Sequence, residues 1–476
     1  MVWTNILNER SFSLKGEEKN MKIVIVGAGN VGYTVARSLS AEGKDVVIVE
    51  RNGALADRIE ADLDVSVVRG NGARPAVLEK AGISRNGDTD ADVLIACTDR
   101  DETNLMACWL AKLGGVPHVF ARVTDMEFTD TPDWAADLGI DMMLSPERTL
   151  SREIASLLRF NAAVHSSQLS NDRTGSFAFR VEESSPICGM SLSELGQKYP
   201  SLGAVMVYVE RGGTGFIPDG SWTAQAGDLC FSVALYDRVS DLQKLFDEEH
   251  HKRLSRVIIV GGGKLGTNLA HRLSNGGVEV TLVDKNLEKC TRLAREFPSV
   301  KVINGDGLDR ELMIQLGVDK ADGVVAATAN DELNAMIACL ANVQDEVKTI
   351  AVVRKDVYKE LETRLPLDVM VNPNATLASA FLRYIRYPNS AKTFSLIDRI
   401  GAEMVEITIR PDSPVAGKRV MDLRLKRGII IAVIKRGESY LVPSGRDELH
   451  EGDVISLFAM AEDMPEAMKF FGVERT

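Results

Sequence analysis

The sequence contains the same glycine-loop unit twice, which restricts the chain to folds that can hold two such units. Residues 27–32 read GAGNVG after a short apolar run, and residues 261–266 read GGGKLG after another. An acidic residue follows each loop, Glu50 in the first copy and Asp284 in the second, so that loop and acid both recur after 234 residues. One such glycine pattern is a weak sign of a nucleotide site. Two in register, each with its acid, indicate two nucleotide sites in one polypeptide.

The repeat continues beyond the glycine loops. Apolar runs within residues 91–98 and 321–328 each lead into the motif Asp-Glu-x-Asn, at residues 101–104 and 331–334. Short, continuous apolar runs that alternate with helical segments are typical of buried parallel strands covered by helices on both faces. We therefore predict an α/β fold with two doubly wound, Rossmann-like parallel sheets.

A second kind of repeat follows each Rossmann-like unit. Residues 185–189 read SPICG and residues 413–417 read SPVAG, and both are followed by β-branched runs with closely spaced turn residues. This pattern predicts a small α+β domain after each larger one. The predicted parts are an N-terminal extension expected to be disordered (1–20), a first Rossmann-like domain (21–148), a connecting helix with the first small domain (149–250), a second Rossmann-like domain (251–385) and a second small domain (386–476).

The composition excludes several classes of protein. A formal net charge of −12 argues against binding nucleic acid or anionic lipid through a basic surface. The sequence has neither an apolar run long enough for a transmembrane helix nor the apolar core of a signal peptide at its start. The six cysteines lack C-x-x-C spacing and the six histidines are scattered, so we expect a cytosolic protein with reduced cysteines and no metal site.

The three glycines of each loop are expected to have different tasks. The first allows the tight turn out of the strand, the second lets the backbone approach a phosphate, and the third lets the helix pack on the sheet. These residues are Gly27, Gly29 and Gly32 in the first copy, and Gly261, Gly263 and Gly266 in the second. The N-terminus of the helix then offers unpaired N–H groups to an anion. The alternative is a glycine-rich turn in a fold that has lost its ligand.

An acid ends the second strand of each unit. Glu50 and Asp284 are expected to accept hydrogen bonds from ribose hydroxyls and to repel a 2′-phosphate, which favours NAD or an adenosine nucleotide over NADP. Arg51 and Lys285 follow directly and could instead contact a phosphate. A solvated carboxylate at the end of a strand remains the alternative.

Further candidates lie where later strands end, at the sheet edge that lines the ligand crevice. The hydroxyls of Thr98 and Thr328 could bind ribose or phosphate, or cap the next helix, and these roles are compatible. Asn71 and Asp306 occupy equivalent loop positions and could touch the adenine.

Two arginines, Arg122 and Arg354, are taken as equivalent residues at the end of the next strand. Each could face a phosphate. Each could equally pair with an aspartate of the Asp-Glu-x-Asn motif, Asp101 in the first copy and Asp331 in the second.

Catalytic signatures are missing from the sequence. A dehydrogenase usually places a proton donor and a substrate anchor in a second domain. His165 and His450 do not correspond between the repeats, and there is no G-K-S/T loop, G-x-S-x-G elbow or kinase motif set. We therefore predict a protein that is not an enzyme and has no catalytic residues. An NAD-dependent oxidoreductase with a duplicated cofactor domain is the alternative, and a nucleotide sensor for some other partner is a third interpretation.

Together, several motifs of the first half resemble the nucleotide-binding part of a regulator-of-potassium-conductance (RCK) domain. They are GAGNVG at 27–32, Glu50, DETN at 101–104, Ala-Arg at 121–122 and SPER at 145–148. The small domains resemble the C-terminal ligand domain of that family, so the resemblance covers residues 21–476. Two such units in tandem without a transmembrane part are similar to cytosolic regulatory subunits of potassium-uptake systems.

The resemblance implies a regulatory subunit that binds NAD(H), with ATP or ADP as further candidates. It implies a homo-oligomeric, tetrameric ring in the cytoplasm, held on the inner face of the cell membrane by a potassium-conducting subunit that the ring gates by changing shape. The implied first site is Gly27, Ala28, Gly29, Asn30, Val31, Gly32, Glu50, Thr98, Asp99 and Arg122. The implied second site is Gly261, Gly262, Gly263, Lys264, Leu265, Gly266, Asp284, Thr328, Ala329 and Arg354.

The two implied sites differ at some positions. The second copy has Ala329 where the first has Asp99, and Asn372-Pro373 where the first has Ser145-Pro146. These departures leave room for a difference in ligand or affinity.

Overall fold

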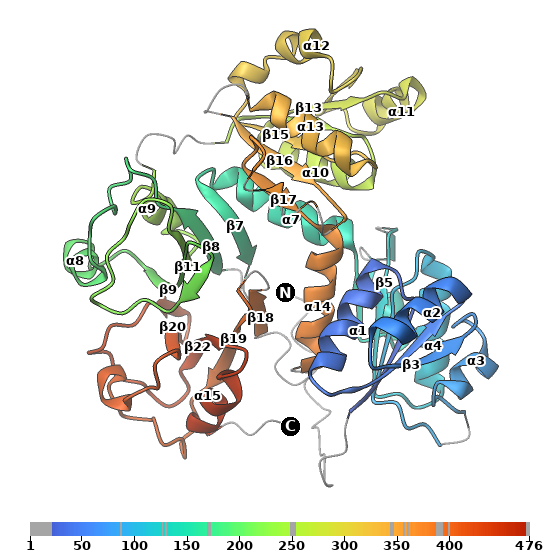
Figure 1. Ribbon diagram of the computed structural model, residues 1–476, viewed down its shortest axis with the longest axis horizontal. Helices are drawn as coiled ribbons and strands as arrows, with labels where there is room; N and C mark the ends of the chain where they lie inside the picture. The colour runs from blue at the N-terminus through green and yellow to red at the C-terminus, as the bar shows by residue number, and fades with distance from the viewer. Residues whose placement is uncertain are drawn as a thin grey trace.

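Figure 1 shows the computed structural model of the chain, whose described residues form two six-stranded and two five-stranded sheets. The structure describes residues 21–472 except 86–87, 126, 129–130, 169–172, 248–253, 343–346, 356–357, 359–360, 363, 387–393 and 398–399. The extension 1–20 lies outside the described residues. Within the described part, no helix is long and apolar enough to cross a membrane.

The first six-stranded sheet is parallel, with the strand order β3-β2-β1-β4-β5-β6. Its strands are β1 (Lys22–Val26), β2 (Asp45–Glu50), β3 (Ser66–Arg69), β4 (Val93–Ala96), β5 (His118–Arg122) and β6 (Met142–Leu144). Its helices are α1 (Asn30–Ala41), α2 (Gly53–Asp62), α3 (Pro75–Lys80), α4 (Asp101–Leu113) and α6 (Pro132–Asp137). Ile23 and Ile25 pack on one face and Val24 and Val26 on the other, so both faces of β1 are buried. The strand order reverses between β1 and β4, where such sheets bind ligands.

The second six-stranded sheet repeats this order as β14-β13-β12-β15-β16-β17. Its strands are β12 (Arg256–Val260), β13 (Glu279–Asp284), β14 (Lys301–Asn304), β15 (Gly323–Ala326), β16 (Lys348–Val352) and β17 (Val369–Val371). Its helices are α10 (Lys264–Asn275), α11 (Leu287–Glu296), α12 (Arg310–Gln315), the 3-10 helix η1 (Val318–Lys320) and α13 (Asp331–Ala341). The two parallel sheets confirm the predicted fold class.

The helix that ends each Rossmann-like unit packs on the other unit. Helix α7 (Pro146–Arg159) inserts Leu150, Ile154 and Leu157 into the core formed by the second sheet and α10. Helix α14 (Pro373–Arg386) inserts Phe381 and its neighbours into the core formed by the first sheet and α1. In Figure 1, α14 accordingly lies beside α1, and α7 lies along the second sheet. The second Rossmann-like domain predicted for residues 251–385 includes α14, whose buried face packs in the core of the first unit.

Each five-stranded sheet is antiparallel and belongs to a small α+β domain. The first contains β7 (Ala163–Gln168), β8 (Thr174–Arg180), β9 (Ala204–Arg211), β10 (Thr214–Phe216) and β11 (Leu229–Leu235), with α8 (Leu192–Lys198) and α9 (Val239–Gln243). The second contains β18 (Phe394–Ile397), β19 (Ala402–Thr408), β20 (Ile430–Arg436), β21 (Ser439–Leu441) and β22 (Val454–Met460), with the 3-10 helix η3 (Val420–Leu423) and α15 (Met464–Phe470). Phe231 and Val207 of the first sheet share a core with Met404 and Phe458 of the second, so the two small domains also pack on each other.

Candidate functional site

A cavity of about 410 Å³ opens at the carboxyl edge of the first parallel sheet, where the strand order reverses. Most of the residues implied for the first site line this cavity: Gly27, Gly29, Asn30, Val31, Glu50, Thr98, Asp99 and Arg122. Ala28 and Gly32 serve the loop in other ways, because Ala28 donates its N–H to Glu50 and Gly32 lies against the loop backbone. The structure therefore brings the glycine loop, the acid and the ends of β4 and β5 together around one space.

The glycine loop has the geometry that each glycine was expected to supply. Gly27 has φ +98°, and a Cβ there would lie 2.9 Å from the side chain of Thr98. A Cβ on Gly32 would lie 2.0 Å from the carbonyl oxygen of Gly27, so α1 can approach β1 only without one. Gly29 is extended, and a Cβ on it would meet nothing within 4 Å. No side chain caps α1 at Gly29, so the first turn presents its N–H groups to the cavity.

Glu50 is a buried carboxylate held by backbone donors. Its Oε2 accepts the N–H of Ala28 and its Oε1 accepts the N–H of Asn52, each at 2.8 Å. Among the described residues, Glu50 forms no ion pair with a cationic side chain. Each carboxylate oxygen therefore keeps acceptor capacity for a ligand, which suits a pair of vicinal hydroxyls.

The Asp-Glu-x-Asn motif ties the ends of β4 and β5 together. Oδ1 of the buried Asn104 accepts the N–H and the hydroxyl of Thr98, at 2.9 and 2.6 Å, and its Nδ2 donates to the carbonyl of Arg122 at 2.9 Å. Asp101 accepts hydrogen bonds from the backbone N–H groups of Thr124 and Asp125. The N-cap residue of α4 is Arg100, whose side chain makes no capping bond. The Thr98 hydroxyl accepts the N–H of Arg100 at 3.2 Å and donates to Asn104, so it is Asn104 that links the ends of β4 and β5.

Arg122 and Arg354 are not equivalent residues, and the expectation that they are is wrong. Strand pairing matches Ala96 with Ala121 in the first sheet and Ala326 with Ala351 in the second. Arg122 therefore corresponds to Val352, and Arg354 corresponds to Thr124. In the sequence, each arginine simply follows an apolar run, and only the pairing of the strands reveals the shift of two residues.

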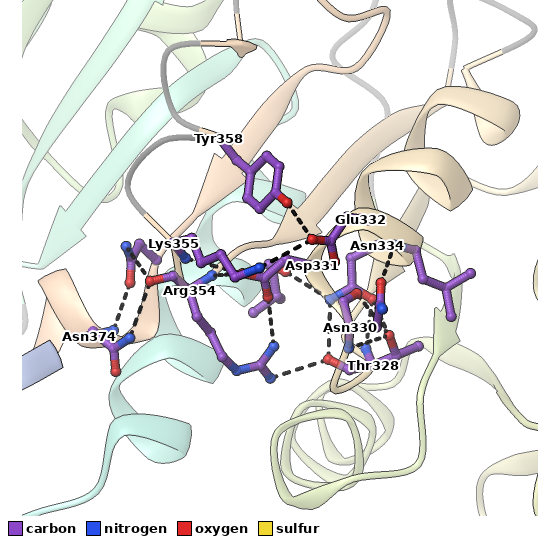
Figure 2. Close-up of polar contacts among 12 residues, drawn as sticks. Thr328, Asn330, Asp331, Glu332, Asn334, Arg354, Lys355, Tyr358 and Asn374 are labelled. Carbon is purple, nitrogen blue, oxygen red and sulfur yellow. Dashed lines mark hydrogen bonds and ion pairs between the residues drawn. The ribbon is translucent and has the colours of Figure 1, made fainter. Parts of the chain in front are cut away.

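The two arginines nevertheless reach similar places. Arg122 lines the first cavity and donates to the carbonyl of Thr98 at 3.3 Å, while its buried Nε has no partner among the described residues. Arg354 donates to the carbonyl of Thr328 at 3.2 Å and to Asp331 at 3.1 Å, as Figure 2 shows. Of the two roles expected for these arginines, the pair with an aspartate is therefore observed for Arg354, which pairs with Asp331.

The second glycine loop repeats the geometry of the first. Gly261 has φ +116°, and a Cβ on Gly266 would lie 1.9 Å from the carbonyl oxygen of Gly261. A Cβ on Gly263 would meet nothing within 4 Å. Leu265 is buried in the core under α10. The second loop can therefore expose its backbone to a ligand in the same way.

The carboxyl edge of the second parallel sheet, beside the second glycine loop, is organised like that of the first sheet. Oδ1 of Asn334 accepts the N–H and the hydroxyl of Thr328, at 2.8 and 2.6 Å, and its Nδ2 donates to Val352 (Figure 2). Ala329, which replaces Asp99, is exposed and offers no polar side chain.

The acid of the second site differs from Glu50 in its partners. Asp284 Oδ2 accepts the N–H of Gly262 and the ammonium of Lys289, each at 2.8 Å. Burial alone would raise the pKa of Asp284, but the hydrogen bonds from Lys289 and from the N–H groups of Asn286 and Gly262 outweigh it and lower the pKa. Asp284 is thus a carboxylate that already has a cationic partner.

A residue of the second half lines the first cavity. Asn374, in the first turn of α14, lines the first cavity, and its Nδ2 donates to the carbonyl of Arg354 at 3.3 Å (Figure 2). Outside the cavity, Lys264 of the second glycine loop donates to Thr124 Oγ1, two residues after β5, at 3.1 Å. The sequence marked residues 372–373 only as the start of a helix, and nothing in it showed that this helix lies on the first sheet.

One buried thiol lies under the first loop. Cys97 lines the cavity, and its Sγ donates to the carbonyl oxygen of Gly27 at 3.4 Å. Burial raises the pKa of Cys97 to about 12, so the thiol stays protonated and is a poor nucleophile. The residues that line the described cavity include no histidine, lysine or tyrosine.

Comparisons with known sequences identify the same units. The TrkA-N domain family matches residues 23–146 and 257–373, and the TrkA-C domain family matches residues 404–472. The Trk system potassium uptake protein TrkA of Vibrio alginolyticus is 30% identical over 449 residues, which covers 92% of this chain and 95% of that protein. The TrkA homolog of Archaeoglobus fulgidus is 31% identical over 452 residues, which covers 95% of this chain and 100% of that protein.

Solved structures share the fold. The GsuK channel superposes with a TM-score of 0.63 at 18% identity, and the GsuK channel bound to NAD with a TM-score of 0.60 at 19% identity. Each match covers 96% of this chain and 80% of the other. At this level of identity, the likeness shows a shared architecture.

Proposed function

This chain belongs to the TrkA family of Trk system potassium uptake proteins, and from this premise we propose that it is a non-catalytic regulatory subunit. Its two crevices bind NAD(H) or adenine nucleotides, and the bound nucleotide sets whether a membrane potassium-conducting subunit opens. The observation that carries the proposal is the first cavity, where a glycine loop at a helix N-terminus, the buried carboxylate of Glu50 and a residue of the other half meet.

The chemistry of the first cavity fits a dinucleotide or an adenosine nucleotide. The uncapped N-terminus of α1 and the open backbone at Gly29 suit a phosphate. The acceptor capacity of Glu50 suits the ribose hydroxyls. The GsuK channel, which shares the fold, is itself known bound to NAD, which supports this choice of ligand.

The packing of the two halves supports a role in gating. A ligand in the first cavity would touch α1 of the first half and Asn374 of α14. Helices α7 and α14 also contact each other across the halves, where Thr376 donates to Glu153 at 3.1 Å. A nucleotide that fits one arrangement of these helices better than another shifts the population by that difference in affinity.

Exposed apolar side chains support assembly into a homo-oligomer. Met106, Trp109 and Leu113 are exposed on α4, and Met336 and Leu340 are exposed on the equivalent helix α13. Repeated apolar surfaces of this kind favour contacts between copies. We propose a ring of four chains in the cytoplasm, peripheral on the inner face of the membrane beneath a TrkH- or TrkG-like subunit.

Calorimetric titration of NAD, NADH, ATP and ADP into the full-length protein tests nucleotide binding. Gly29→Asp and Gly263→Asp place a charged side chain into open space in each loop and should abolish binding at that site. Gly196→Asp, in α8 and also in open space, is the matched control and should bind like the wild type. We expect near two nucleotides per chain and no turnover, and hydride transfer to a small substrate would instead support the oxidoreductase.

Co-expression with the membrane subunit tests the gating role. A strain that lacks its own potassium uptake should grow at low potassium with the wild-type chain. The double variant Gly29→Asp/Gly263→Asp should fail to respond to nucleotide in potassium-flux assays, although it still co-purifies with the membrane subunit. A double variant that regulates flux normally would refute the proposed function.

A further inference from the structure

Glu50 and Asp284 have different neighbours at one structurally equivalent position. Asn52 caps α2 by accepting the N–H of Leu55 at 3.2 Å, and Asn286 caps α11 by accepting the N–H of Lys289 at 2.8 Å. Leu55 and Lys289 therefore occupy the same place in the first turn of equivalent helices. In the first half this place holds an apolar side chain that lines the cavity, and in the second half it holds a cation.

This exchange changes what the acid can still accept. Each oxygen of Glu50 accepts a single backbone N–H, from Ala28 or from Asn52. In the second half, Oδ2 of Asp284 accepts both a backbone N–H and the ammonium of Lys289, and Oδ1 accepts the N–H of Asn286 at 2.9 Å. A vicinal diol would have to share Asp284 with Lys289, whereas it could use both oxygens of Glu50.

A second ion pair completes the contrast. Lys285 pairs with Asp306 at 3.0 Å. The equivalent residues of the first half, Arg51 and Asn71, both line the open cavity. The lysines around Asp284 thus pair with acids. Among the described residues, Glu50 and Arg51 form no ion pair, and Asn71 Oδ1 accepts the N–H of Ala73 at 3.0 Å.

We propose that Lys289 is a specificity-determining residue that weakens recognition of the ribose diol at the second site, so that NAD(H) fills the first site before the second. The proposal rests on the function proposed above, since it assigns unequal roles to the same two sites. The ligand must compete with a charge-assisted hydrogen bond for Asp284. Because Lys289 also offsets the charge of Asp284, a 2′-phosphate is repelled less there than at Glu50, and the preference for NADH over NADPH is smaller.

Site-resolved titrations test the proposal in the full-length chain. The Gly29→Asp background reports the second site, and the Gly263→Asp background reports the first. We expect Lys289→Leu to tighten NADH binding at the second site about tenfold, the equivalent of one ordinary hydrogen bond. A larger change is not expected, because the Lys289 side chain is 33% exposed and solvent screens the pair.

Two further variants keep the proposal testable if Lys289→Leu fails to fold. Lys289→Arg preserves the cation and should leave NADH binding weak. The reciprocal Leu55→Lys should weaken NADH binding at the first site about tenfold and reduce its preference for NADH over NADPH. Melting curves of all variants identify any that unfold.

Distinct results separate this proposal from the one on which it rests. Equal NADH affinity at the two sites, or no response to Lys289→Leu and Leu55→Lys, would overturn the role of Lys289 while nucleotide sensing stands. A second site that binds no nucleotide even with Lys289→Leu would overturn it as well. Absence of nucleotide binding at both wild-type sites would overturn the proposed function itself.

Discussion

Replacing Gly32 by alanine should destabilise the first half, because the structure leaves no room for a methyl group there. The new Cβ would lie 2.0 Å from the carbonyl oxygen of Gly27 and 3.1 Å from Cys97 Sγ. Gly27 cannot yield easily, since its φ is +98° and its N–H donates to the carbonyl of Val49 at 2.9 Å. Helix α1 must therefore move away from β1. Overpacking of this kind costs about 1–3 kcal/mol, and more where backbone must shift.

The size of the effect can be measured by calorimetry together with hydrogen exchange. A loss of about 1–3 kcal/mol lowers the melting temperature of a unit of this size by roughly 2–12 °C. Faster amide exchange should be centred on β1, α1, β2 and α14, which packs on α1. NADH binding at the first site should weaken because the loop is displaced.

Gly29→Ala is the matched control in the same loop. Its Cβ would meet nothing within 4 Å, so stability should stay within about 0.5 kcal/mol of the wild type. A Gly32→Ala protein that melts with the wild type and with Gly29→Ala would refute the close approach of α1 to β1.

Three further predictions concern single side chains of the two sites. Asn374→Ala should weaken NADH binding at the first site about three- to tenfold, because one polar contact is lost. Binding at the second site should not change. The Gly263→Asp background reports the first site, and the Gly29→Asp background reports the second. Because the pKa of Asp284 is lowered, its pair with Lys289 contributes stability above the ordinary carboxyl range and loses it as the pH falls through the lowered pKa. The stability difference between the wild type and Lys289→Met should therefore shrink as the pH drops below about 4, and a constant difference would contradict the ion pair. Cys97 should resist alkylation at pH 8 in the folded protein, since burial raises its pKa to about 12, whereas in denaturant all six cysteines should react.

Much of the fold follows from the sequence because buried parallel strands appear as continuous apolar runs. The runs at β1 and β12 predict both sheets, and the glycine spacing locates the turns that need positive φ at Gly27 and Gly261. The acids also lie where the pattern places them, with Glu50 and Asp284 each accepting an N–H from the adjacent loop. These features are local, so a single sequence is enough to predict them.

The features that the sequence does not reveal depend on contacts between distant segments. The amphipathic pattern of α14 shows that one face is buried, but it does not show that Phe381 packs on the first sheet rather than on the second. Asn374 could therefore not be assigned to the first cavity. The register of β5 and β16 is likewise set by pairing with β4 and β15, which is why Arg122 and Arg354 looked equivalent.

Helices α7 and α14 each pack on the other Rossmann-like unit, so the two halves of the chain are related like the subunits of a dimer that exchange a helix. In a symmetric dimer of identical chains, both sites must carry the same residues. Here the halves are joined covalently, so equivalent positions can diverge: Leu55 faces one site and Lys289 the other, while Asn374 and Glu147 occupy the same position in α14 and α7. A pair of sites with unequal affinity responds to nucleotide over a wider concentration range than two equal sites. On the inference drawn above for Lys289, covalent duplication would let this chain grade its response through fixed differences in sequence, whereas identical single units could do so only through negative cooperativity.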